Sequence, residues 1–366
     1  MTKLLNILGT RGIPGRHGGY ETFATRFAPY MVQCGWEVTV YCQLDIGMAP
    51  FEDEWKGVRR VHFAPRSGGA RGTMEFDAKT VGDVLKRPGV DLVLGYNTAI
   101  FNLLQCLRGR RIAMNMDGLE WQREKWSLPA KIWLLMNELV GANLSNILIA
   151  DHPEIARHFR SRSFRKIVMI PYGADAITSA PTDPIKRYGL EPGAYMIKIA
   201  RAVPENSILE IIRAFSRTER PGKLVVLGNF SNSDPYQAAC LAAAGGQVVF
   251  PGAIFEEETV GALRFHARAY LHGHRVGGTN PSLCEALGAG NAVIAHDNRF
   301  NRWTAGAGQL FFADEDGCAA AISTLFSDSS ALAAAQQAAR ARHAAAFTWP
   351  VILSAYEDAM TELLKG

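Results

Sequence analysis

Short apolar runs alternate along the chain with longer segments in which apolar residues recur at helical spacing. In the first half the apolar runs lie at 4–8, 38–41, 58–63, 91–94, 112–116, 147–149 and 167–170. Helical periodicity fills 75–87, 97–107 and 129–145, and a further helix is expected to begin near Gly19. Short continuous apolar runs are typical of strands that are buried on both faces. The alternation predicts an α/β doubly wound fold.

One of these runs departs from the apolar pattern. The segment 58–63 carries Arg59 and Arg60 in its middle. Charged side chains are typical of strands at the edge of a sheet. We therefore expect this strand at an edge.

The alternation restarts after a segment at 173–193 that is rich in alanine, proline, threonine and glycine. The second set of apolar runs lies at 195–200, 223–227, 248–250 and 292–295, and the helical segments at 208–215, 256–268, 315–326, 329–346 and 350–364. A chain of 366 residues is longer than one typical hydrophobic core supports. The restart therefore predicts two similar domains, at 1–172 and 173–346, followed by a last helical segment at 347–366.

Composition and charge exclude several classes of protein. The hydrophobic fraction of 48% and the charged fraction of 20% are ordinary for a globular protein. A net charge of +4 does not indicate a nucleic-acid binder, although it would suit anionic substrates or an anionic membrane surface. The six cysteines form no CxxC pair and fit neither a zinc site nor a disulfide framework, so we expect free thiols.

No segment is long and apolar enough to predict a transmembrane helix, which needs roughly 18 consecutive apolar residues. The N-terminal residues also lack a signal-peptide cleavage pattern. We therefore expect a cytoplasmic protein, with peripheral membrane contact as an option. The segment 121–135 interleaves basic residues with tryptophans, as membrane-interface segments do, but ordinary packing of one helix face explains it equally well.

A glycine-rich segment, GTRGIPGRHGGYETF at 9–23, lies between the first strand and the first helix. This order is the start of a βαβ unit. The segment contains neither GxGxxG nor GxxxxGK[ST], so the dinucleotide fingerprint and the P-loop are both absent. Arg11, Arg16 and His17 are able to contact a phosphate or a sugar, and a solvated glycine turn is the alternative interpretation.

The segment RVGGTNPSLCEALGAGNAVIAHDN at 275–298 combines a glycine loop, a helix and a strand. Pro281 suits the first turn of a helix, where its missing N–H has no cost. The unpaired N–H groups and the positive end of the helix dipole favour an anion. We predict a diphosphate cradle here, with Glu285 placed to bind a sugar hydroxyl.

Polar residues also follow two other predicted strands. Asp117 and Glu120 come after 112–116, and Arg201 follows 195–200. Ligands of open α/β sheets bind beyond the carboxyl ends of the strands, and an arginine there can clamp a phosphate. The alternatives are an aspartate that caps a turn and a surface arginine. The only DxD, at Asp314–Asp316, suits a helix start better than a metal site.

Five stretches of the sequence carry a resemblance to a known family. The chain resembles the retaining glycosyltransferases of the GT-B fold, family GT4, and more closely the DUF1972-type branch that includes bacterial rhamnosyltransferases. The stretches are GTRGIPGRHGGYETF at 9–23, NMDGLEW at 115–121, PYGAD at 171–175, ARAVPEN at 200–206 and RVGGTNPSLCEALGAGNAVIAHDN at 275–298.

This resemblance implies two Rossmann-like domains that face each other across a cleft, with the last helix packing back on the first domain. It implies that 1–172 binds the acceptor and 173–346 binds a nucleotide-sugar donor, of dTDP or UDP type. The acceptor would be a glycan or a polyprenyl-diphosphate-linked glycan, and neither a metal nor a cofactor nor nucleic acid would be required.

The resemblance also assigns roles by matching positions. Glu285 matches the second glutamate of the E-x7-E motif, which binds the donor ribose, and Arg201 matches an arginine that contacts the donor phosphates. Asp117 lies where many of these enzymes carry an active-site histidine. The catalytic set is then Asp117, Arg201 and Glu285, the donor-binding set is Gly12, Gly18, Gly19, Asn206, His274, Gly278, Thr279, Asn280, Pro281, Ser282 and Glu285, and the acceptor-binding set is Arg16, His17, Tyr20 and Glu120.

The sequence departs from the family pattern at two positions. Gly277 replaces the first glutamate of E-x7-E, and His274 or Asn280 would have to substitute for its contact with the donor sugar. Asn206 replaces a lysine of the usual phosphate clamp. Charge stabilisation would then depend more on Arg201 and the helix N-terminus, with an arginine of 9–23 as a further contributor.

Two other classes of function remain alternatives. An NAD-dependent oxidoreductase would carry GxGxxG, which neither half of the chain does. A GT-B epimerase or a non-catalytic nucleotide-sugar binding protein is compatible with Gly277.

Overall fold

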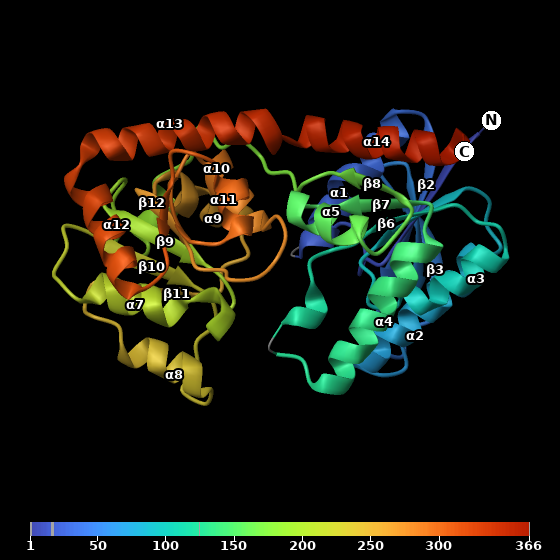
Figure 1. Ribbon diagram of the computed structural model, residues 1–366, viewed down its shortest axis with the longest axis horizontal. Helices are drawn as coiled ribbons and strands as arrows, with labels where there is room; N and C mark the ends of the chain where they lie inside the picture. Colours follow the sequence, from blue (N-terminus) through green and yellow to red (C-terminus); the bar gives the residue numbers. More distant parts are fainter. Residues whose placement is uncertain (1, 16–17, 124, 366) are drawn as a thin grey trace. The chain divides into compact units, whose positions relative to one another are not determined.

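A computed structural model describes residues 2–15, 18–123 and 125–365. The chain divides into two compact units, and each is an α/β layered structure (Figure 1). Unit 1 comprises 1–171 and 350–366, and unit 2 comprises Tyr172–Trp349. The chain therefore leaves unit 1 once and returns to it for the last helix.

Unit 1 is built on an eight-stranded sheet in the order β3-β4-β2-β1-β5-β6-β7-β8. All described strand pairs are parallel except β3–β4. The strands are β1 (Lys3–Leu8), β2 (Trp36–Gln43), β3 (Phe51–Trp55), β4 (Val58–Phe63), β5 (Val90–Leu94), β6 (Ile112–Asn115), β7 (Ile147–Ala150) and β8 (Lys166–Met169). The strand order changes direction between β1 and β5, and the loops beyond the carboxyl ends of such a pair are where ligands bind in open α/β sheets.

The prediction that 58–63 forms an edge strand is wrong. Strand β4 lies inside the sheet, because the acidic strand β3 pairs with it in antiparallel register and takes the edge. Arg60 Nε donates a hydrogen bond of 2.8 Å to Asp53 Oδ1 of β3. This cross-strand partner neutralises the charge that indicated an edge.

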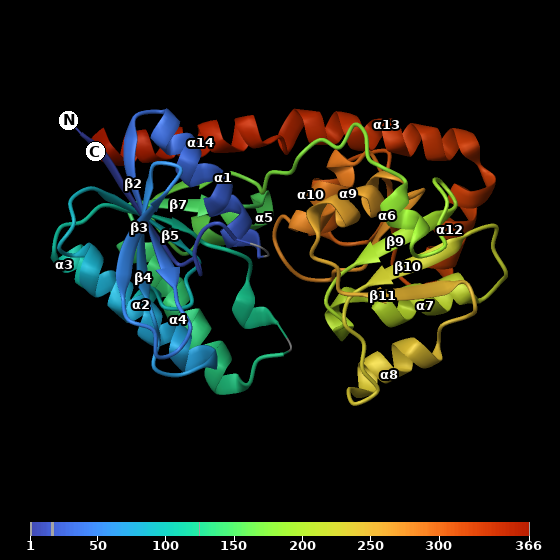
Figure 2. The same cartoon turned by 180° about the vertical axis from the view of Figure 1, so that it is seen from behind.

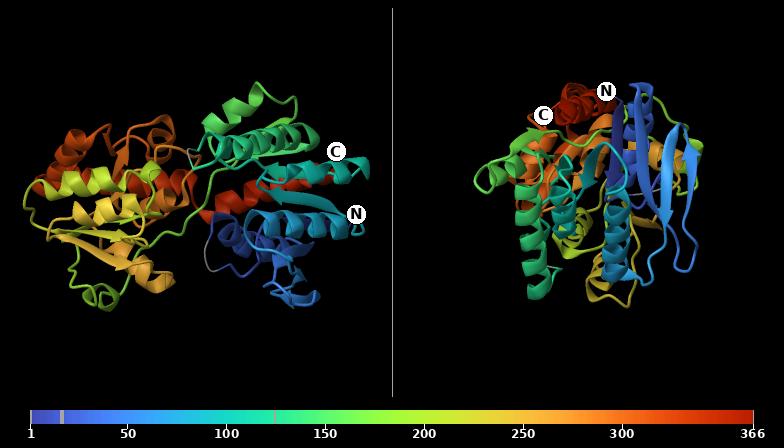
Figure 3. Two further views of the ribbon diagram at one scale, coloured as in Figure 1. Left: turned by 90° about the horizontal axis from the view of Figure 1, so that it is seen from below. Right: turned by 90° about the vertical axis from the view of Figure 1, so that its right-hand side faces the viewer.

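Helices cover both faces of this sheet (Figure 3). Helix α1 and the C-terminal helix α14 lie on one face, where the rings of Phe23 and Tyr356 are 4.4 Å apart, and α2, α3 and α4 lie side by side on the other. The segment 97–107 forms a 3₁₀ turn followed by a short α-helix, where a single helix was predicted. The helical elements are α1 (Gly19–Gln33), α2 (Gly69–Val84), η1 (Ala99–Phe101), α3 (Asn102–Leu107), η2 (Glu120–Gln122), α4 (Leu128–Leu144), α5 (Pro153–Arg160) and α14 (Trp349–Lys365).

Unit 2 is built on a six-stranded parallel sheet in the order β11-β10-β9-β12-β13-β14 (Figure 2). Its strands are β9 (Tyr195–Ile199), β10 (Lys223–Leu227), β11 (Val248–Gly252), β12 (Ala269–His272), β13 (Ala292–His296) and β14 (Leu310–Phe312). Its helical elements are α6 (Asp183–Lys186), η3 (Pro204–Asn206), α7 (Ile208–Ser216), α8 (Pro235–Ala242), α9 (Glu257–Phe265), α10 (Pro281–Gly288), α11 (Arg299–Ala305), α12 (Glu315–Ser327) and α13 (Ser329–Ala346). The strand order changes direction between β9 and β12.

Two hydrophobic cores lie on opposite faces of the unit 2 sheet. Ile197 and Tyr270 pack in the core that includes residues of α9 and α10, whereas Met196 and Leu271 pack in the core that includes residues of α7 and α12. Neighbouring residues of one strand point to opposite faces, so a strand buried on both faces needs apolar residues at every position. This explains why the apolar runs predicted these strands well.

Several helices of unit 2, namely α8, α10, α11, α12 and α13, begin at a residue whose side chain accepts a hydrogen bond from the first turn. Asp314 accepts a hydrogen bond of 2.8 Å from the Gly317 N–H at the start of α12. The acidic residues at 314–316 therefore stabilise a helix N-terminus, as the sequence predicted.

Candidate functional site

The first turn of α10 lies directly beyond the carboxyl end of β12. Asn280 caps the helix by accepting a hydrogen bond of 3.0 Å from the Ser282 N–H, and Pro281 occupies the first helical position. The hydroxyl groups of Ser282 and Tyr270 are 2.8 Å apart. Burial raises the pKa of Tyr270 to about 12, so this phenol stays protonated and fastens the helix start to the sheet.

Glu285 lies one turn into α10 and forms an ion pair with Arg264 of α9. The Arg264 guanidinium also lies 3.4 Å from Ser282 Oγ. The Arg264 side chain is only 11% exposed, whereas the Glu285 side chain is 33% exposed. The carboxylate is thus anchored from the protein side and open on the other, which suits it to accept a ligand hydroxyl. No local sequence pattern indicates Arg264, because its pairing with Glu285 depends on the tertiary fold.

The loop between β12 and α10 contains Gly277, the position at which the sequence departs from E-x7-E. Gly277 has a φ of +139° and open space around it. L-residues rarely adopt this backbone conformation, so a glutamate here would be strained even though it has room. His274, Gly278 and Thr279 lie in the same loop, and Thr279 is buried.

The loop after β9 is held against the loop after β12. The Arg275 N–H donates a hydrogen bond of 3.0 Å to the Glu205 carbonyl, and a Cβ added at Gly273 would lie 2.2 Å from the Asn206 carbonyl oxygen. Asn206 is buried and donates from Nδ2 to the Arg201 carbonyl at 2.8 Å. One amide hydrogen of Asn206 therefore shapes the turn, while the Arg201 side chain is exposed beyond the end of β9.

Two buried titratable side chains that no sequence pattern indicated, Lys198 and His272, lie on the strands that precede these loops. Lys198 of β9 is fully buried, and its Nζ has no hydrogen-bond partner among the described residues. Burial lowers the pKa of Lys198 to about 7. His272 is also fully buried, and its ring stacks on that of His274 with the centroids 4.3 Å apart. Burial lowers the pKa of His272 well below its usual value, and the positive charge of the nearby Lys198 lowers it further. A hydrogen bond with Asn301 opposes this shift.

In unit 1, Asp117 lies just beyond the carboxyl end of β6. Its φ of 51° is unusual for a residue with a side chain, and its N–H donates a hydrogen bond of 2.9 Å to Asn115 Oδ1. Asp117 Oδ1 in turn accepts a hydrogen bond of 2.8 Å from the Gly118 N–H. Burial raises the pKa of Asp117 to about 6, and the negative charge of Glu120 adds to this shift. Strained backbone and a raised pKa together are typical of functional positions.

The structure brings Tyr20 to the same turn. Tyr20 Oη donates a hydrogen bond of 3.3 Å to Asn115 Oδ1, and Asn115 Nδ2 donates one of 2.7 Å to Tyr356 Oη of α14. Burial raises the pKa of Tyr20 well above its usual value, and Asp117 adds to the rise. Tyr20 and Asp117, both candidates from the sequence, are therefore joined through Asn115, and Tyr356 completes the network.

Glu120 already has several local partners. It forms an ion pair of 2.5 Å with Arg123 and one of 3.5 Å with Lys125, and it accepts a hydrogen bond of 3.3 Å from Trp126 Nε1. Its backbone N–H donates to Tyr96 Oη at 2.9 Å. An acceptor substrate would have to compete with these contacts.

The glycine-rich loop after β1 is shaped by close packing. Gly12 has a φ of +124°, and a Cβ added there would lie 2.9 Å from the Cys42 side chain. Glu21 Oε1 accepts a hydrogen bond of 2.9 Å from the Arg11 N–H. Gly18 caps α1 and Gly19 is its first residue. Arg16 and His17, which the sequence analysis proposed as acceptor contacts, lie outside the described residues.

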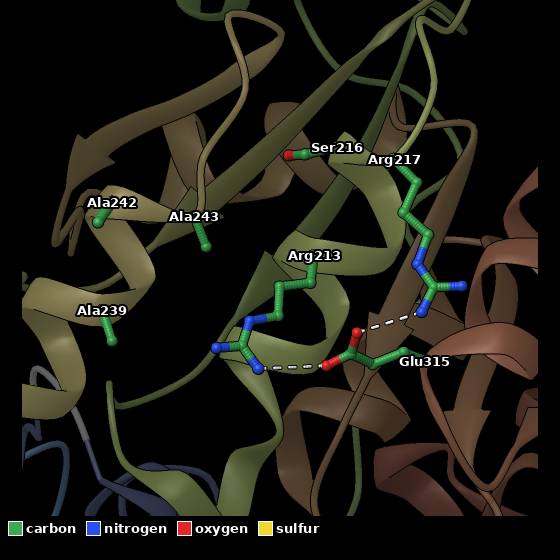
Figure 4. Close-up of a pocket in the computed structure, with 7 residues that line it drawn as sticks. All are labelled: Arg213, Ser216, Arg217, Ala239, Ala242, Ala243 and Glu315. Carbon is green, nitrogen blue, oxygen red and sulfur yellow. Dashed lines mark hydrogen bonds and ion pairs between the residues drawn. The ribbon is translucent and has the colours of Figure 1, made fainter.

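A pocket of about 650 Å³ lies elsewhere on unit 2 (Figure 4). Arg213 and Arg217 in it reach Glu315 at 3.4 and 3.2 Å, so their charges are already partnered. Its lining residues come from or directly follow α7, α8 and α12, and they are Arg213, Ser216, Arg217, Ala239, Ala242, Ala243 and Glu315. None of them belongs to the loops at the carboxyl ends of β9 and β12. The pocket is therefore separate from the candidate site.

The described residues contain no group of three or more His, Cys, Asp or Glu side chains arranged to hold a metal ion. Within the same residues no single helix is long and apolar enough to cross a membrane, and only α12 and α13 taken together reach that length and composition, with a bend of 102° between them.

Two parallel-sheet Rossmann-like units, with the last helix returning to the first unit, define the GT-B class of α/β proteins. The chain is similar over its whole length to solved structures of this class. Sucrose-phosphate synthase from Thermosynechococcus elongatus matches with a TM-score of 0.83 and 16% identity, covering 99% of each chain. The UDP-forming α,α-trehalose-phosphate synthase from Burkholderia xenovorans, solved with glucose-6-phosphate, matches with a TM-score of 0.74 and 14% identity, covering 100% of each chain.

A third similar structure is HepE from Anabaena in complex with UDP and glucose. It matches with a TM-score of 0.73 and 15% identity, covering 99% of this chain and 100% of HepE. In sequence, residues 2–175 match the family model described as "Domain of unknown function (DUF1972)". No curated protein matches the chain in sequence.

Proposed function

We propose that this protein is a glycosyltransferase that moves a hexose from a nucleoside-diphosphate sugar to an acceptor hydroxyl. The observation that carries the proposal is the start of α10. There a capped helix N-terminus follows the carboxyl end of β12, and Glu285 is held by Arg264 with part of its carboxylate exposed. A helix N-terminus attracts a diphosphate, and an anchored carboxylate accepts hydrogen bonds from ribose hydroxyls.

In this proposal the bond between the anomeric carbon and the diphosphate oxygen breaks, the acceptor oxygen bonds to the anomeric carbon, and the proton of the acceptor hydroxyl passes to the leaving diphosphate. The leaving diphosphate gains negative charge, which the first turn of α10 and the exposed Arg201 stabilise. Asn206 stands where the family has a lysine, so these two groups would also have to supply the stabilisation that the lysine's positive charge provides. We propose that no metal ion is required.

We propose that unit 1 binds the acceptor. Asp117, with its pKa raised to about 6, would orient the acceptor hydroxyl or stabilise positive charge on the sugar, and Tyr20 would stand beside it through Asn115. The finer assignments rest on the sequence resemblance. They are membership of GT4, transfer with retention, rhamnose as the sugar, and a glycan or polyprenyl-diphosphate-linked acceptor in bacterial polysaccharide synthesis.

Two further parts of the proposal follow from the same resemblance. The donor would be a UDP- or dTDP-sugar, and UDP is the nucleotide named with the HepE structure. The protein would act on the cytoplasmic face of the membrane, in peripheral contact with it.

The test is a transfer assay with Glu285→Ala and Arg201→Ala against a panel of nucleotide sugars, preceded by a thermal-shift screen for the donor. Loss of one charged contact should lower kcat/KM about 10- to 100-fold, or roughly 1.5–3 kcal/mol. Glu257→Ala at the start of α9 and Arg217→Ala at the separate pocket are matched controls and should retain activity. Wild-type kcat/KM in both site variants would refute the site.

Gly277 favours a second candidate function. A protein that lacks the sugar-binding glutamate, in a loop whose backbone disfavours one, is compatible with a nucleotide-sugar epimerase or a non-catalytic binding protein. Product analysis with a labelled nucleotide sugar separates the three. A transferase yields a glycosylated acceptor, an epimerase changes only the sugar, and a binding protein leaves the donor intact.

A further inference from the structure

Helices α3 and α4 of unit 1 expose an uncovered apolar face. We name it the α3–α4 surface, and its members are between 42 and 74% exposed. They are Leu103, Leu104 and Leu107 of α3 and Leu128, Ile132, Met136 and Leu139 of α4. The spacing of the α4 residues places them on one side of the helix, while Leu134, Asn137 and Glu138 face the protein. Single exposed apolar residues are ordinary, but a stripe of them indicates a partner.

The two helices are neighbours, so their exposed residues belong to one region (Figure 3). Asn137 Oδ1 of α4 accepts a hydrogen bond of 2.8 Å from the Ile100 N–H just before α3. The Cys106 thiol of α3 donates one of 3.0 Å to the Leu144 carbonyl of α4. The helices therefore run alongside each other from the middle of α4 to its end.

The surface continues into the loop between α5 and β8. Asn143, exposed one turn beyond Leu139, donates to the Arg162 carbonyl at 3.4 Å, and its own carbonyl accepts from Arg165 Nε at 3.1 Å. The loop fastened in this way carries Phe164, which is fully exposed. The sequence around it, RSRSFRK at 160–166, surrounds this phenylalanine with basic residues.

Charge identifies the kind of partner. Between Ser127 and Asn146 the sequence has one acidic residue, Glu138, and this side chain is fully buried against Trp121 and His158. Between Ala99 and Arg111 the sequence has none. The charges beside the apolar face are thus positive, and they include Lys131 and the exposed Arg108. Within these two segments the apolar residues are flanked by basic ones, which matches the acyl and headgroup layers of an anionic bilayer.

The tryptophans that first indicated a membrane segment have other roles. Trp121 Nε1 donates to Glu138 at 2.8 Å and Trp133 Nε1 donates to the Asn97 carbonyl at 3.0 Å. Trp126 is paired with Glu120 and with Lys125. These contacts direct the indole N–H groups to the protein, so within 121–135 the side chains that belong to the α3–α4 surface are Leu128 and Ile132, with Lys131 beside them.

We propose that the α3–α4 surface and Phe164 dock unit 1 on an anionic phospholipid bilayer. This inference rests on the proposed function in one respect: a lipid-linked acceptor would explain why the protein binds a bilayer. Binding itself needs neither donor nor acceptor, so it is measurable even if the transferase assignment fails.

The test is flotation of the full chain with vesicles of phosphatidylcholine alone or mixed equally with phosphatidylglycerol. The wild-type protein should float with the mixed vesicles, bind phosphatidylcholine far less, and lose binding as salt is added. The variant Leu128→Gln/Ile132→Gln/Met136→Gln/Leu139→Gln should lose binding by about tenfold or more, because glutamine keeps helix propensity but removes the apolar contact. Phe164→Gln should weaken binding, and Lys131→Gln/Arg108→Gln should lower it only for the anionic vesicles.

The matched control is Ile46→Gln/Met48→Gln, which removes two exposed apolar side chains from a turn elsewhere in unit 1 and should bind like wild type. Circular dichroism and thermal melting establish that each variant is folded. Absence of wild-type flotation, or undiminished binding of the α4 variant, overturns the proposal. A concentration-dependent dimer that the α4 variant abolishes, with no vesicle binding, would assign the surface to a second copy of the chain and would also overturn it.

Discussion

The Asn115 side-chain amide donates a hydrogen bond of 2.7 Å to the phenol oxygen of Tyr356, a residue 241 positions later. The other amide atom of Asn115, Oδ1, accepts from the Asp117 N–H and from Tyr20. One buried asparagine therefore connects the C-terminal helix to the turn that carries Asp117, a candidate catalytic residue. The orientation of Asp117 depends on a residue of α14 that no local sequence signal connects to it.

Removing this tie should affect both stability and turnover. Tyr356→Phe keeps the ring against Phe23 but leaves the Asn115 N–H without its acceptor, which should cost about 1–3 kcal/mol of unfolding free energy. We expect kcat to fall while KM for the donor is unchanged, because Arg201, Glu285 and the other candidate donor residues of the loop before α10 lie in unit 2. Tyr30→Phe is the matched control, since Tyr30 Oη donates to Glu357 of the same helix at 3.0 Å. An equal fall of kcat in both variants would show a general effect of helix packing.

Asp117 should give activity a pH dependence. Its pKa of about 6 means that the ionised form becomes dominant as the pH rises through that value. If the ionised form acts, kcat/KM of the wild type rises between pH 5 and 7, and Asp117→Asn is slower and lacks this limb. Asp77→Asn is a matched control, because burial also raises the pKa of Asp77 to about 6 but its partner is Thr98. If Asp77→Asn instead of Asp117→Asn abolishes the rise in kcat/KM between pH 5 and 7, the titrating group is Asp77 and not Asp117.

The same shift has a consequence for stability. A carboxyl group with a raised pKa in the folded state favours folding below its unfolded pKa of about 4, and this contribution is lost as the pH rises through about 6. Asp117→Asn should therefore be more stable than wild type at pH 7.5 and not at pH 4. Urea denaturation at the two pH values measures the difference. A variant that is less stable than wild type at pH 7.5 would contradict the assignment of burial as the cause.

The buried amine of Lys198 should make the free energy of unfolding decrease as the pH falls. Its folded pKa of about 7 lies below the value of about 10.4 for a free lysine, so the stability present above pH 10.4 is lost as the pH falls to 7. Lys198→Met should be roughly 1–3 kcal/mol more stable than wild type near pH 7, with a smaller difference at high pH. Lys223→Met, at the start of the neighbouring strand β10, is the control and should show no such trend. A Lys198 variant that is less stable at pH 7 would indicate a hidden partner for the amine.

Gly277 should resist restoration of the family's glutamate. Gly277→Glu places a side chain on a backbone with a φ of +139°, which should cost about 1–3 kcal/mol and weaken donor binding by displacing the loop. Gly246→Glu is the control in the same unit, because Gly246 also has open space around it but does not have a positive φ. Thermal melting and donor-induced thermal shifts measure both effects. A Gly277 variant that binds the donor more tightly would show that the loop accommodates the carboxylate.

The periodicity of the sequence predicted most of the architecture, because strands buried on both faces need continuous apolar runs. Elements whose stability depends on tertiary pairing were missed. Strand β3 has the sequence FEDEW, which is not an apolar run, and it forms because its acidic residues pair with the arginines of β4. The error over the edge position of β4 has the same origin.

The candidate site was predictable only where local geometry creates it. Asn280 and Pro281 are residue types that predict a helix start, and the position of Glu285 one turn further along predicts that its side chain lies near this start. Arg264, by contrast, lies in another helix, and its pairing with Glu285 has no local signal. Lys198 was hidden inside the run YMIKI, because the pattern of a buried strand gives no reason to separate one polar residue from its apolar neighbours.

The return of α14 to unit 1 gives the chain an order of completion during synthesis. Phe23 and Phe27 are made early, yet the ring of Tyr356 that covers them follows only after all of unit 2 has been translated. At a translation rate of about 5–20 residues per second, the aromatic face of α1 waits on the order of ten seconds or more for its cover. Unit 2 is continuous in sequence and does not wait in this way. The growing chain is therefore expected to complete its second unit before its first, and the exposed aromatic face of α1 is the surface that a chaperone would have to protect in the interval.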